Sequence, residues 1–322
     1  MTYPNVRRII PGPTALRFLP QTLQYFSTFV LLMACCNSSG CGQASPTGNV
    51  HAGTAENSAT LGALPPPKTP PHAEMVSTDG DEQTFMVPMR DGVNLATYVY
   101  GAAPAGAAPD GAAPAGNPVI LVRTPYGHAQ VEDIARAAEL TGYVVVVQDV
   151  RGRYASEGDF QMIFKEGEDG YDTIEWIAAQ PWSYGKIGMF GMSYLGITQW
   201  AAAIESPPHL TCIFPIVAPS DYYNGMVYQD GALRQELTGG WLDDIATHSN
   251  WWKDHENDAG GDVGLHQTET NWRWHLPLDE PGPIGRGGPA LVSLWQQLLD
   301  HPSEDGFWRQ LNPSSHYAGV KV

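Results

Sequence analysis

A serine stands where a strand-like segment meets a helix-like segment. Residues 186–190 resemble a buried strand and residues 194–203 a helix, and the turn between them, residues 191–196, reads G-M-S-Y-L-G. A serine in such a turn takes a strained backbone that raises its hydroxyl above the carboxyl end of a sheet. The next backbone amide, at the helix N-terminus, can stabilise a developing oxyanion. We therefore predict Ser193 as a nucleophile and the Tyr194 amide as an oxyanion donor.

The turn departs by one position from the usual pattern G-x-S-x-G. Leu195 takes the place of the second glycine, and Gly196 follows one residue late. A bare G-x-S-x-x-G occurs by chance, so its interpretation depends on the strand–turn–helix context. The alternative is a turn serine without a catalytic role.

The elements that would position this serine alternate along the chain. Two strand-like segments, 84–90 and 93–100, flank Asp91-Gly92, a strong signal for a hairpin. Further strands are expected at 118–123, 143–148, 186–190 and 212–217, and helices at 132–140, 169–179 and 194–203. Short, continuously apolar strands separated by helices are typical of a parallel sheet covered on both faces. The predicted fold class is α/β.

Charge and cysteine content exclude some functions. The chain has 322 residues with 34 acidic and 17 basic side chains, a net charge of −17. A general nucleic-acid binder needs clustered positive charge, which this composition does not supply. The four cysteines, at positions 35, 36, 41 and 212, fit no zinc framework, and a disulfide scaffold is not expected. We predict no metal and no cofactor.

The first 36 residues have the layout of an export signal. Arg7, Arg8 and Arg17 precede the short apolar run 26–34, and the first 55 residues contain no acid. The run ends in L-M-A-C at residues 32–35, which resembles a bacterial lipobox, so we predict lipidation of Cys35 and a membrane-anchored lipoprotein. Ordinary cleavage near residue 34, an uncleaved anchor and a twin-arginine signal are the alternatives. Residues 37–82 are expected to be a flexible tether.

Several ordered motifs carry a resemblance to a known family. They are V-P-M-R-D-G-V at 87–93, R-T-P-Y at 123–126, D-V-R-G-R at 149–153, S-E-G at 156–158, D-G-Y-D at 169–172, Trp182, G-K-I-G at 185–188 and the serine turn. From about residue 84 to residue 322 the chain resembles the cocaine esterase and X-Pro dipeptidyl-peptidase type (CocE/NonD) of serine hydrolases. The resemblance implies an α/β-hydrolase core, here 83–225, that cleaves small esters or peptides through an acyl-enzyme.

The resemblance also implies a role for Tyr126, whose hydroxyl would complete the oxyanion hole. Tyr126 stands on the loop after the expected strand 118–123, where a hydrolase of this fold should supply its second donor. The alternative is an aromatic residue that only packs in the loop.

An aromatic segment follows the last expected strand. Seven of the ten tryptophans lie between residues 241 and 308, with helices expected near 226–250 and 288–300 and a glycine-rich loop near 259–264. In the family this region is a helical cap, here 226–310, which closes over the pocket, and 311–322 returns to the core. Aromatic residues suit a lid that excludes water and binds an apolar acyl group. Packing of a small subdomain is the alternative.

Two charged groups near the expected site have structural explanations. Acidic side chains at the start of a helix are stabilised by the positive end of the helix dipole. We expect this role, and not metal binding, for the five acids of the expected helix near 169, which are Glu166, Glu168, Asp169, Asp172 and Glu175. Arg151 and Arg153 could meet a carboxylate substrate, but we expect them to brace the loop beside the site.

A serine hydrolase also needs a histidine base and an acid. The resemblance puts both after a further core strand, of which Lys321 and Val322 would be the first two residues, and adds a C-terminal β-sandwich that we expect to be absent here. We therefore assign neither base nor acid, although Asp221 could orient a histidine. We expect packing or surface roles for the histidines at 248, 255, 266, 275, 301 and 316.

Two functions are predicted for the chain. The first is an exported serine hydrolase that is nearly inactive as this isolated chain. The second is a catalytically dead remnant that at most binds acyl ligands or a partner. No acid stands near the serine turn, which favours a neutral acyl ester as substrate.

Overall fold

The computed structural model describes residues 65–67, 72–102, 116–139, 141–255, 276–280 and 282–322. All of them belong to one folding unit, Gly48–Val322. The predicted export signal with Cys35, the glycine-rich loop near 259–264, His266 and His275 lie outside the described residues. Within them, no helix has the length and apolar character needed to cross a membrane.

Seven strands form one mixed sheet in the order β1-β2-β3-β5-β4-β6-β7. Their bounds are Glu74–Asp79, Glu82–Pro88, Asn94–Tyr100, Asn117–Thr124, Val144–Asp149, Ser183–Met192 and Leu210–Ile216, for β1 to β7 in chain order. The strands from β5 to β7 in this order pair in parallel, whereas β1, β2 and β3 add an antiparallel edge. The predicted strands and the α/β class are confirmed.

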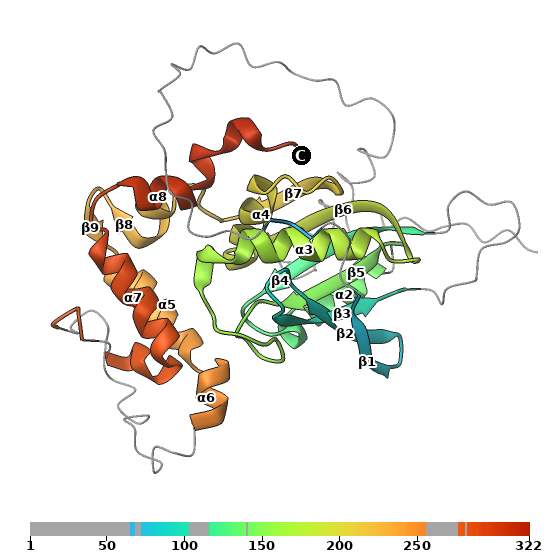
Figure 1. The fold of residues 1–322 in the computed structure, drawn as a ribbon, viewed down its shortest axis with the longest axis horizontal. Helices are drawn as coiled ribbons and strands as arrows, with labels where there is room; N and C mark the ends of the chain where they lie inside the picture. The colour runs from blue at the N-terminus through green and yellow to red at the C-terminus, as the bar shows by residue number, and fades with distance from the viewer. Residues whose placement is uncertain (1–64, 68–71, 103–115, 140, 256–275, 281) are drawn as a thin grey trace, which may run out of the picture. The chain divides into compact units, whose positions relative to one another are not determined.

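Three helices cover the sheet: α2 (Glu132–Glu139), α3 (Glu166–Ala178) and α4 (Tyr194–Ile204). Within the sheet, β5 and β6 lie on opposite sides of β4, so the connection from β4 to β5 and the connection from β5 to β6 run in opposite directions. Because such crossovers are right-handed, α2 and α3 cover opposite faces. α3 packs against α4 over β4 and β6 (Figure 1). All six residues of β5 are buried, as in a strand covered on both faces.

A buried apolar layer joins the sheet to α3 and α4. Ile174 and Ile177 of α3 are fully buried beside Trp176, and Leu121 and Val146 supply the sheet side of the same cluster. Ile174 and Ile177 stand three residues apart, close to one helical turn, which turns both towards the sheet. Ile187 and Met189 of β6 and Ala202 and Ala203 of α4 belong to the same layer, so β6 and α4 share one core.

The second part of the chain is largely helical. It contains a short π-helical turn at Tyr223–Val227, the hairpin strands β8 (Tyr228–Gln229) and β9 (Ala232–Leu233), and the helices α5 (Gln235–Ala246), α6 (Asn250–His255), α7 (Pro289–Asp300) and α8 (Gly306–Leu311). Helices α5 and α7 pack side by side (Figure 1). The 3₁₀ turns of the described chain lie at His128–Gln130, Met162–Phe164, Gly282–Gly287, Pro313–Ser315 and Tyr317–Gly319.

The predicted helix at 226–250 is wrong in its first nine residues and again after Ala246, where α5 ends. Asp230 and Gly231 have φ angles of 51° and 84° and form the turn of the β8–β9 hairpin. Both central residues of such a turn need positive φ, which Asp-Gly adopts readily. The helix begins only at Gln235. Asp230-Gly231 is therefore a hairpin signal in the sequence, but the apolar spacing around it favours a helix and led to the wrong prediction.

Two other boundaries need correction. The expected tether 37–82 extends too far, because Glu74–Asp79 forms β1 and pairs with β2. Backbone pairing alone accounts for this strand, whose six residues are all exposed. At the other end, Lys321 and Val322, expected as the first two residues of a further strand, are not in a strand. Val320 instead packs against the apolar layer of the sheet.

Candidate active site

Ser193 occupies the turn between β6 and α4 with φ 56° and ψ −126°. A positive φ is rare for a residue with a side chain and costs about 1–3 kcal/mol, so the surroundings must hold it. The Ser193 amide donates to the Ile216 carbonyl of β7 at 2.9 Å, and the Ser193 carbonyl accepts from the amides of Gly196 and Ile197. The side chain is exposed. This is the strained, accessible geometry that the turn pattern predicts.

The two glycines of the turn lie where neighbouring side chains come too close to leave room for a Cβ atom. A Cβ on Gly191 would lie 2.4 Å from the Cβ of Leu195, and a Cβ on Gly196 would lie 2.5 Å from the Cβ of Ala218. Leu195 is thus accommodated because its neighbour is Gly191. The late glycine, Gly196, is the position at which α4 meets the segment after β7.

Tyr194 is the first residue of α4, so its amide is among the helix N–H groups that have no acceptor within the helix. Its side chain is buried, and its hydroxyl donates to Oε1 of Glu166 at 2.8 Å. Burial raises the pKa of this hydroxyl well above its ordinary value. The Tyr194 ring stacks on Trp241 at 5.2 Å between centroids. The side chain therefore anchors the helix start that presents the amide.

Three arginines, from β4 and from the turns after β2 and β5, meet the acids of α3. Arg123 Nη1 lies 2.8 Å from Oε2 of Glu166, Arg151 Nη2 lies 2.6 Å from Asp169, and Arg90 Nη2 lies 2.8 Å from Asp172. Burial raises the pKa of Glu166, against the opposing effect of Arg123. These acids therefore serve ion pairs. In the described part of the chain, no group of three or more potential ligands is arranged to hold a metal ion.

Tyr126 lies on the loop after β4 and is partly buried. Its amide donates to Oγ1 of Thr124 at 3.1 Å, and its hydroxyl oxygen accepts from Nε1 of Trp241 at 3.2 Å. The preceding carbonyl, that of Pro125, accepts from Nε of Arg153 at 2.9 Å. The predicted bracing role of Arg153 is confirmed by this contact, and that of Arg151 by its pairs with Asp91 and Asp169.

The sheet brings the Tyr126 loop and the Ser193 turn to the same edge. β4 and β6 are adjacent and parallel, with Leu121 opposite Met189, so their carboxyl ends lie together. The chain leaves β4 towards α2 on one face and leaves β6 towards α4 on the other. This reversal creates a crevice at the strand ends, where α/β proteins bind their ligands.

A cavity of about 330 Å³ opens at Ser193 and Tyr194. Arg234 is the one charged side chain in its described lining, and its Nη1 donates to the Gly225 carbonyl at 2.8 Å. The apolar lining comes from the 3₁₀ turn at Met162–Phe164, from α4, from the segment after β7 with its π-helical turn, and from α5. Its residues are Met162, Ile197, Val217, Pro219, Met226, Leu237 and Trp241. A site of this size and character suits a small apolar ligand.

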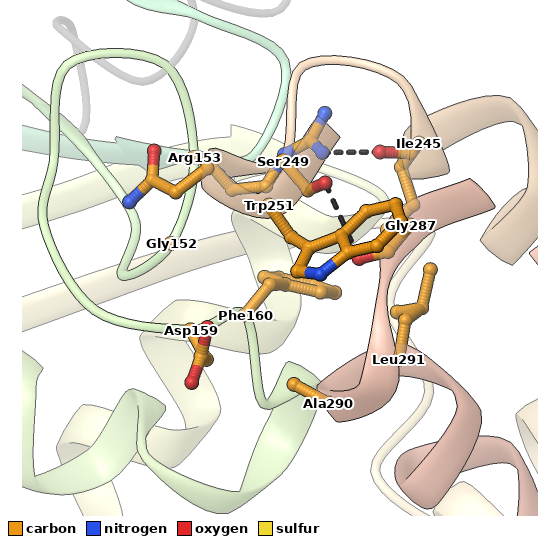
Figure 2. Close-up of a pocket in the computed structure, with 11 residues that line it drawn as sticks. Gly152, Arg153, Asp159, Phe160, Ile245, Ser249, Trp251, Gly287, Ala290 and Leu291 are labelled. Atoms are coloured by element: carbon orange, nitrogen blue, oxygen red, sulfur yellow. Dashed lines mark hydrogen bonds between the residues drawn. The ribbon is translucent and has the colours of Figure 1, made fainter. Parts of the chain in front are cut away.

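A second cavity lies where the loop after β5 meets α5 and α7. Figure 2 shows Arg153, Phe160 and Trp251 around it, with the Arg153 guanidinium bonded to the Ile245 carbonyl. Its volume is about 10 Å³, room for no more than one water molecule. It is a packing feature, and we place no substrate there.

No histidine lines the larger cavity among the described residues. Four of the six histidines named above lie in the described residues and have other contacts: His248 stacks on Tyr154, His255 on Trp251 and His301 on Phe307, and His316 bonds the Gln310 carbonyl. Asp221 accepts from the Asn224 amide at 3.0 Å and from Nδ2 of Asn312 at 2.9 Å. Its described contacts therefore do not include a histidine.

Sequence reasoning missed two residues of this site. Trp241 was one of several tryptophans in an aromatic segment, and Arg234 stood out by no pattern. The density of aromatic residues indicated that some of them reach the pocket, but not which.

Comparisons with known proteins identify the family of the chain. The model of the family described as X-Pro dipeptidyl-peptidase (S15 family) matches residues 91–322. Cocaine esterase from Rhodococcus sp. (strain MB1 Bresler) is 36% identical over 249 residues, which cover 73% of this chain and 41% of that protein. The chain thus spans less than half the length of this relative.

Solved structures show the same fold. An aminopeptidase from a marine sediment Thaumarchaeota archaeon is 24% identical, with a TM-score of 0.52 over 83% of this chain and 44% of that one. An α-amino acid ester hydrolase is 23% identical, with a TM-score of 0.53 over 84% of this chain and 44% of that one. The predicted α/β-hydrolase fold is confirmed. With the family match over residues 91–322, the chain belongs to the X-Pro dipeptidyl-peptidase (S15) family of hydrolases, of the type that includes cocaine esterase.

Proposed function

We propose that the chain provides the nucleophile and the oxyanion hole of a serine hydrolase that cleaves esters or amides through an acyl-enzyme. The observation that carries the proposal is Ser193 itself. It is an exposed serine held at φ 56° between β6 and α4, and it opens into an apolar cavity of about 330 Å³. A strained turn at a cavity, with an unused helix amide beside it, is the arrangement that nucleophilic catalysis requires.

The chemistry follows from these positions. Ser193 Oγ attacks the substrate carbonyl carbon and gives its proton to a base, and the carbonyl oxygen becomes an oxyanion. The Tyr194 amide and the Tyr126 hydroxyl donate hydrogen bonds to that oxygen. The intermediate collapses, the alcohol or amine leaves with the proton, and water then hydrolyses the acyl-enzyme. We assign the base and its acid to no described residue.

The cavity supports a neutral, apolar acyl group as substrate. No carboxylate lines it among the described residues, so nothing there would attract a substrate ammonium group. An ester fits this lining better than a peptide with a free amino terminus. The name of cocaine esterase indicates an ester substrate for that relative.

We further propose that residues 226–310 form a lid over the core, 83–225, and that the protein is exported and anchored by lipid on Cys35. The lid is supported by α5, whose Leu237, Thr238 and Trp241 line the cavity at Ser193. The anchor is supported by the lipobox-like sequence at 32–35. A Cys35→Ser variant should move from the detergent phase to the aqueous phase, and equal partitioning with wild type would exclude the anchor.

A fluorophosphonate probe tests the hydrolase proposal. An active hydrolase should be labelled by the probe, and its Ser193→Ala variant should stay unlabelled, because only an activated serine displaces the leaving group of the probe. Ser293→Ala, which alters an exposed serine of α7, is the matched control and should label like wild type. Equal labelling of wild type and Ser193→Ala would reject Ser193 as the nucleophile.

The absence of a histidine from the described lining favours a second candidate, an acyl-binding protein without turnover. That protein would not react with the probe but would still bind a short acyl ester, detected as a change in the fluorescence of Trp241. Labelling at Ser193 would exclude this candidate.

A further inference from the structure

Trp241 of α5 touches both residues that would supply the oxyanion hole. Its indole Nε1 lies 3.2 Å from the Tyr126 hydroxyl, and its ring stacks on Tyr194 at 5.2 Å with an interplanar angle of 18°. We infer that Trp241 is a positioning residue that aims the Tyr126 hydroxyl proton at the oxyanion. The inference rests on the proposed function and adds to it a part played by the helical segment.

The direction of the hydrogen bond is fixed by chemistry. An indole N–H can only donate, so the Tyr126 oxygen is the acceptor. The hydroxyl proton of Tyr126 is therefore not used in this bond and is available to a second acceptor. A hydroxyl that accepts one hydrogen bond also becomes a better donor of another. The contact thus prepares Tyr126 to donate, which is what an oxyanion donor must do.

The indole plane is held from two further sides. Tyr194, on which it stacks, is itself tied through its hydroxyl to the buried Glu166. Phe160 packs edge-on against the same indole at 6.2 Å and 60°. With these contacts the Nε1–H vector has little freedom, and so the Tyr126 hydroxyl meets a donor of fixed position.

Arg153 joins the two segments that carry Tyr126 and Trp241. Its Nε donates to the carbonyl of Pro125, and its Nη1 donates to the carbonyls of Ile245 and Thr247, at 3.0 Å for Thr247. Figure 2 shows the guanidinium reaching the Ile245 carbonyl. Ile245 follows Trp241 by four residues on α5, so the two lie on one face of the helix. The spacing between Tyr126 and Trp241 is therefore set by a buried side chain.

A double-mutant cycle on the full chain tests the inference. Trp241→Phe keeps an aromatic ring against Tyr194 but removes the N–H. We expect Trp241→Phe to lower kcat for p-nitrophenyl butyrate by about 3- to 10-fold, the effect of one hydrogen bond, once the rate of Ser193→Ala is subtracted. In a Tyr126→Phe background the same change should have no further effect on kcat. Trp252→Phe, the same substitution on α6, should leave kcat unchanged.

A purely acyl-binding role for Trp241 would give a different result. Trp241→Phe would then raise KM, and its effect would persist undiminished in the Tyr126→Phe background. Either additive effects on kcat or an unchanged kcat in Trp241→Phe would overturn the inference.

A spectroscopic readout keeps the test independent of turnover. The indole N–H proton signal of Trp241, assigned by its loss in Trp241→Phe, should shift upfield in Tyr126→Phe and stay in place in Tyr98→Phe. An unmoved signal in Tyr126→Phe would overturn the inference whatever the activity. If no variant shows a rate that depends on Ser193, the proposed function fails, and this signal alone decides whether Trp241 holds the Tyr126 hydroxyl.

Discussion

The two halves of the candidate site are built in different ways. In the Ser193 half, the strand, the turn and the helix follow one another in the chain, and the two glycines that the turn needs lie within three residues of the serine. In the Tyr126 half, the backbone before Tyr126 is held by Arg153, 28 residues beyond Pro125, and the hydroxyl by Trp241, 115 residues away. The nucleophile is set by local structure, and the second oxyanion donor by tertiary contacts.

This difference assigns different tasks to the two parts of the chain. The sheet and α4 hold a strained serine whose geometry depends on close backbone packing. The helical segment holds the Tyr126 hydroxyl through the hydrogen bond from Trp241, while Arg153, on the loop after β5, ties the backbone before Tyr126 to α5. Damage to α5 should therefore impair transition-state stabilisation while it leaves the serine turn in place.

Arg153→Met is expected to have the largest effect. Arg153 is only 2% exposed, and its loss would leave the carbonyls of Pro125, Ile245 and Thr247 without their donor. Unsatisfied buried carbonyls should lower the free energy of unfolding by about 3–5 kcal/mol. Burial lowers the pKa of Arg153 to about 10, so it is charged at neutral pH. Urea unfolding measures the loss.

Arg136→Met is the control for this prediction. Arg136 is exposed and pairs with Asp81 and Glu132 on the surface, where ion pairs contribute little. A loss for Arg153→Met no larger than that for Arg136→Met would mean that the Tyr126 half is not held by this residue.

Tyr126→Phe is expected to come next. In any active, full-length context, removal of one oxyanion donor should lower kcat by ~10²–10³-fold. The free energy of unfolding should change by less than about 1 kcal/mol, because only the acceptor of the Trp241 N–H is lost. Steady-state kinetics and urea unfolding of the same samples check both parts. Activity that survives within a factor of about two would make Tyr126 a packing residue.

Gly196→Ala probes the Ser193 half. The new Cβ would lie 2.5 Å from the Cβ of Ala218, so α4 or the segment after β7 must move. Overpacking of this kind should cost about 1–3 kcal/mol of stability and reduce labelling of Ser193 by the probe. Thermal unfolding and probe labelling are the measurements.

Gly240→Ala is the matched control, because a Cβ on this α5 residue would meet no atom within 4 Å. There the substitution should stabilise the helix by about 0.5–1 kcal/mol. Equal effects at Gly196 and Gly240 would show that the late glycine of the turn has no packing role.

Asp149→Asn should have an effect on stability no larger than that of Gly196→Ala, and the effect should depend on pH. Asp149 ends β5 beside the loop that carries Arg153, and burial raises its pKa to about 6 from an ordinary 3.8. The native state therefore binds this proton more tightly than the unfolded state. Between pH about 4 and about 6 the free energy of unfolding should fall as the pH rises, and above about 6 the loss is complete.

The asparagine variant lacks this ionisation and should be more stable than wild type by about 1–3 kcal/mol at pH 7, with a smaller difference at pH 4. Its amide oxygen can still accept from the Tyr98 hydroxyl, as Oδ2 of Asp149 does at 3.3 Å. Urea midpoints from pH 4 to 7 measure the difference, with Asp133→Asn, at an exposed residue of α2, as control. Parallel curves for wild type and Asp149→Asn would contradict the prediction.

The sequence alone was sufficient where neighbours in the chain are also neighbours in space. The apolar runs that became β4, β5, β6 and β7, the Asp91-Gly92 hairpin and the strand–turn–helix around Ser193 could all be predicted. Their signals are hydrophobic period and turn chemistry, which are local properties. The same local signal at Asp230-Gly231 was overlooked, and the helix near 226–250 was extended over it.

Tertiary structure alone decided how the second half of the site is made. No spacing rule connects Trp241 to Tyr126, and none leads from Arg153 to the carbonyls of Ile245 and Thr247. The strand order is a second tertiary contribution. The chain places β5 on one side of β4 and β6 on the other, and the parallel pairing of β4 with β6 brings the Tyr126 loop beside the Ser193 turn. The sequence by itself determined an α/β fold with a serine poised at a strand end. Which aromatic side chain faces that serine depends on long-range packing, because a hydrogen bond between distant residues leaves no periodic trace in the chain.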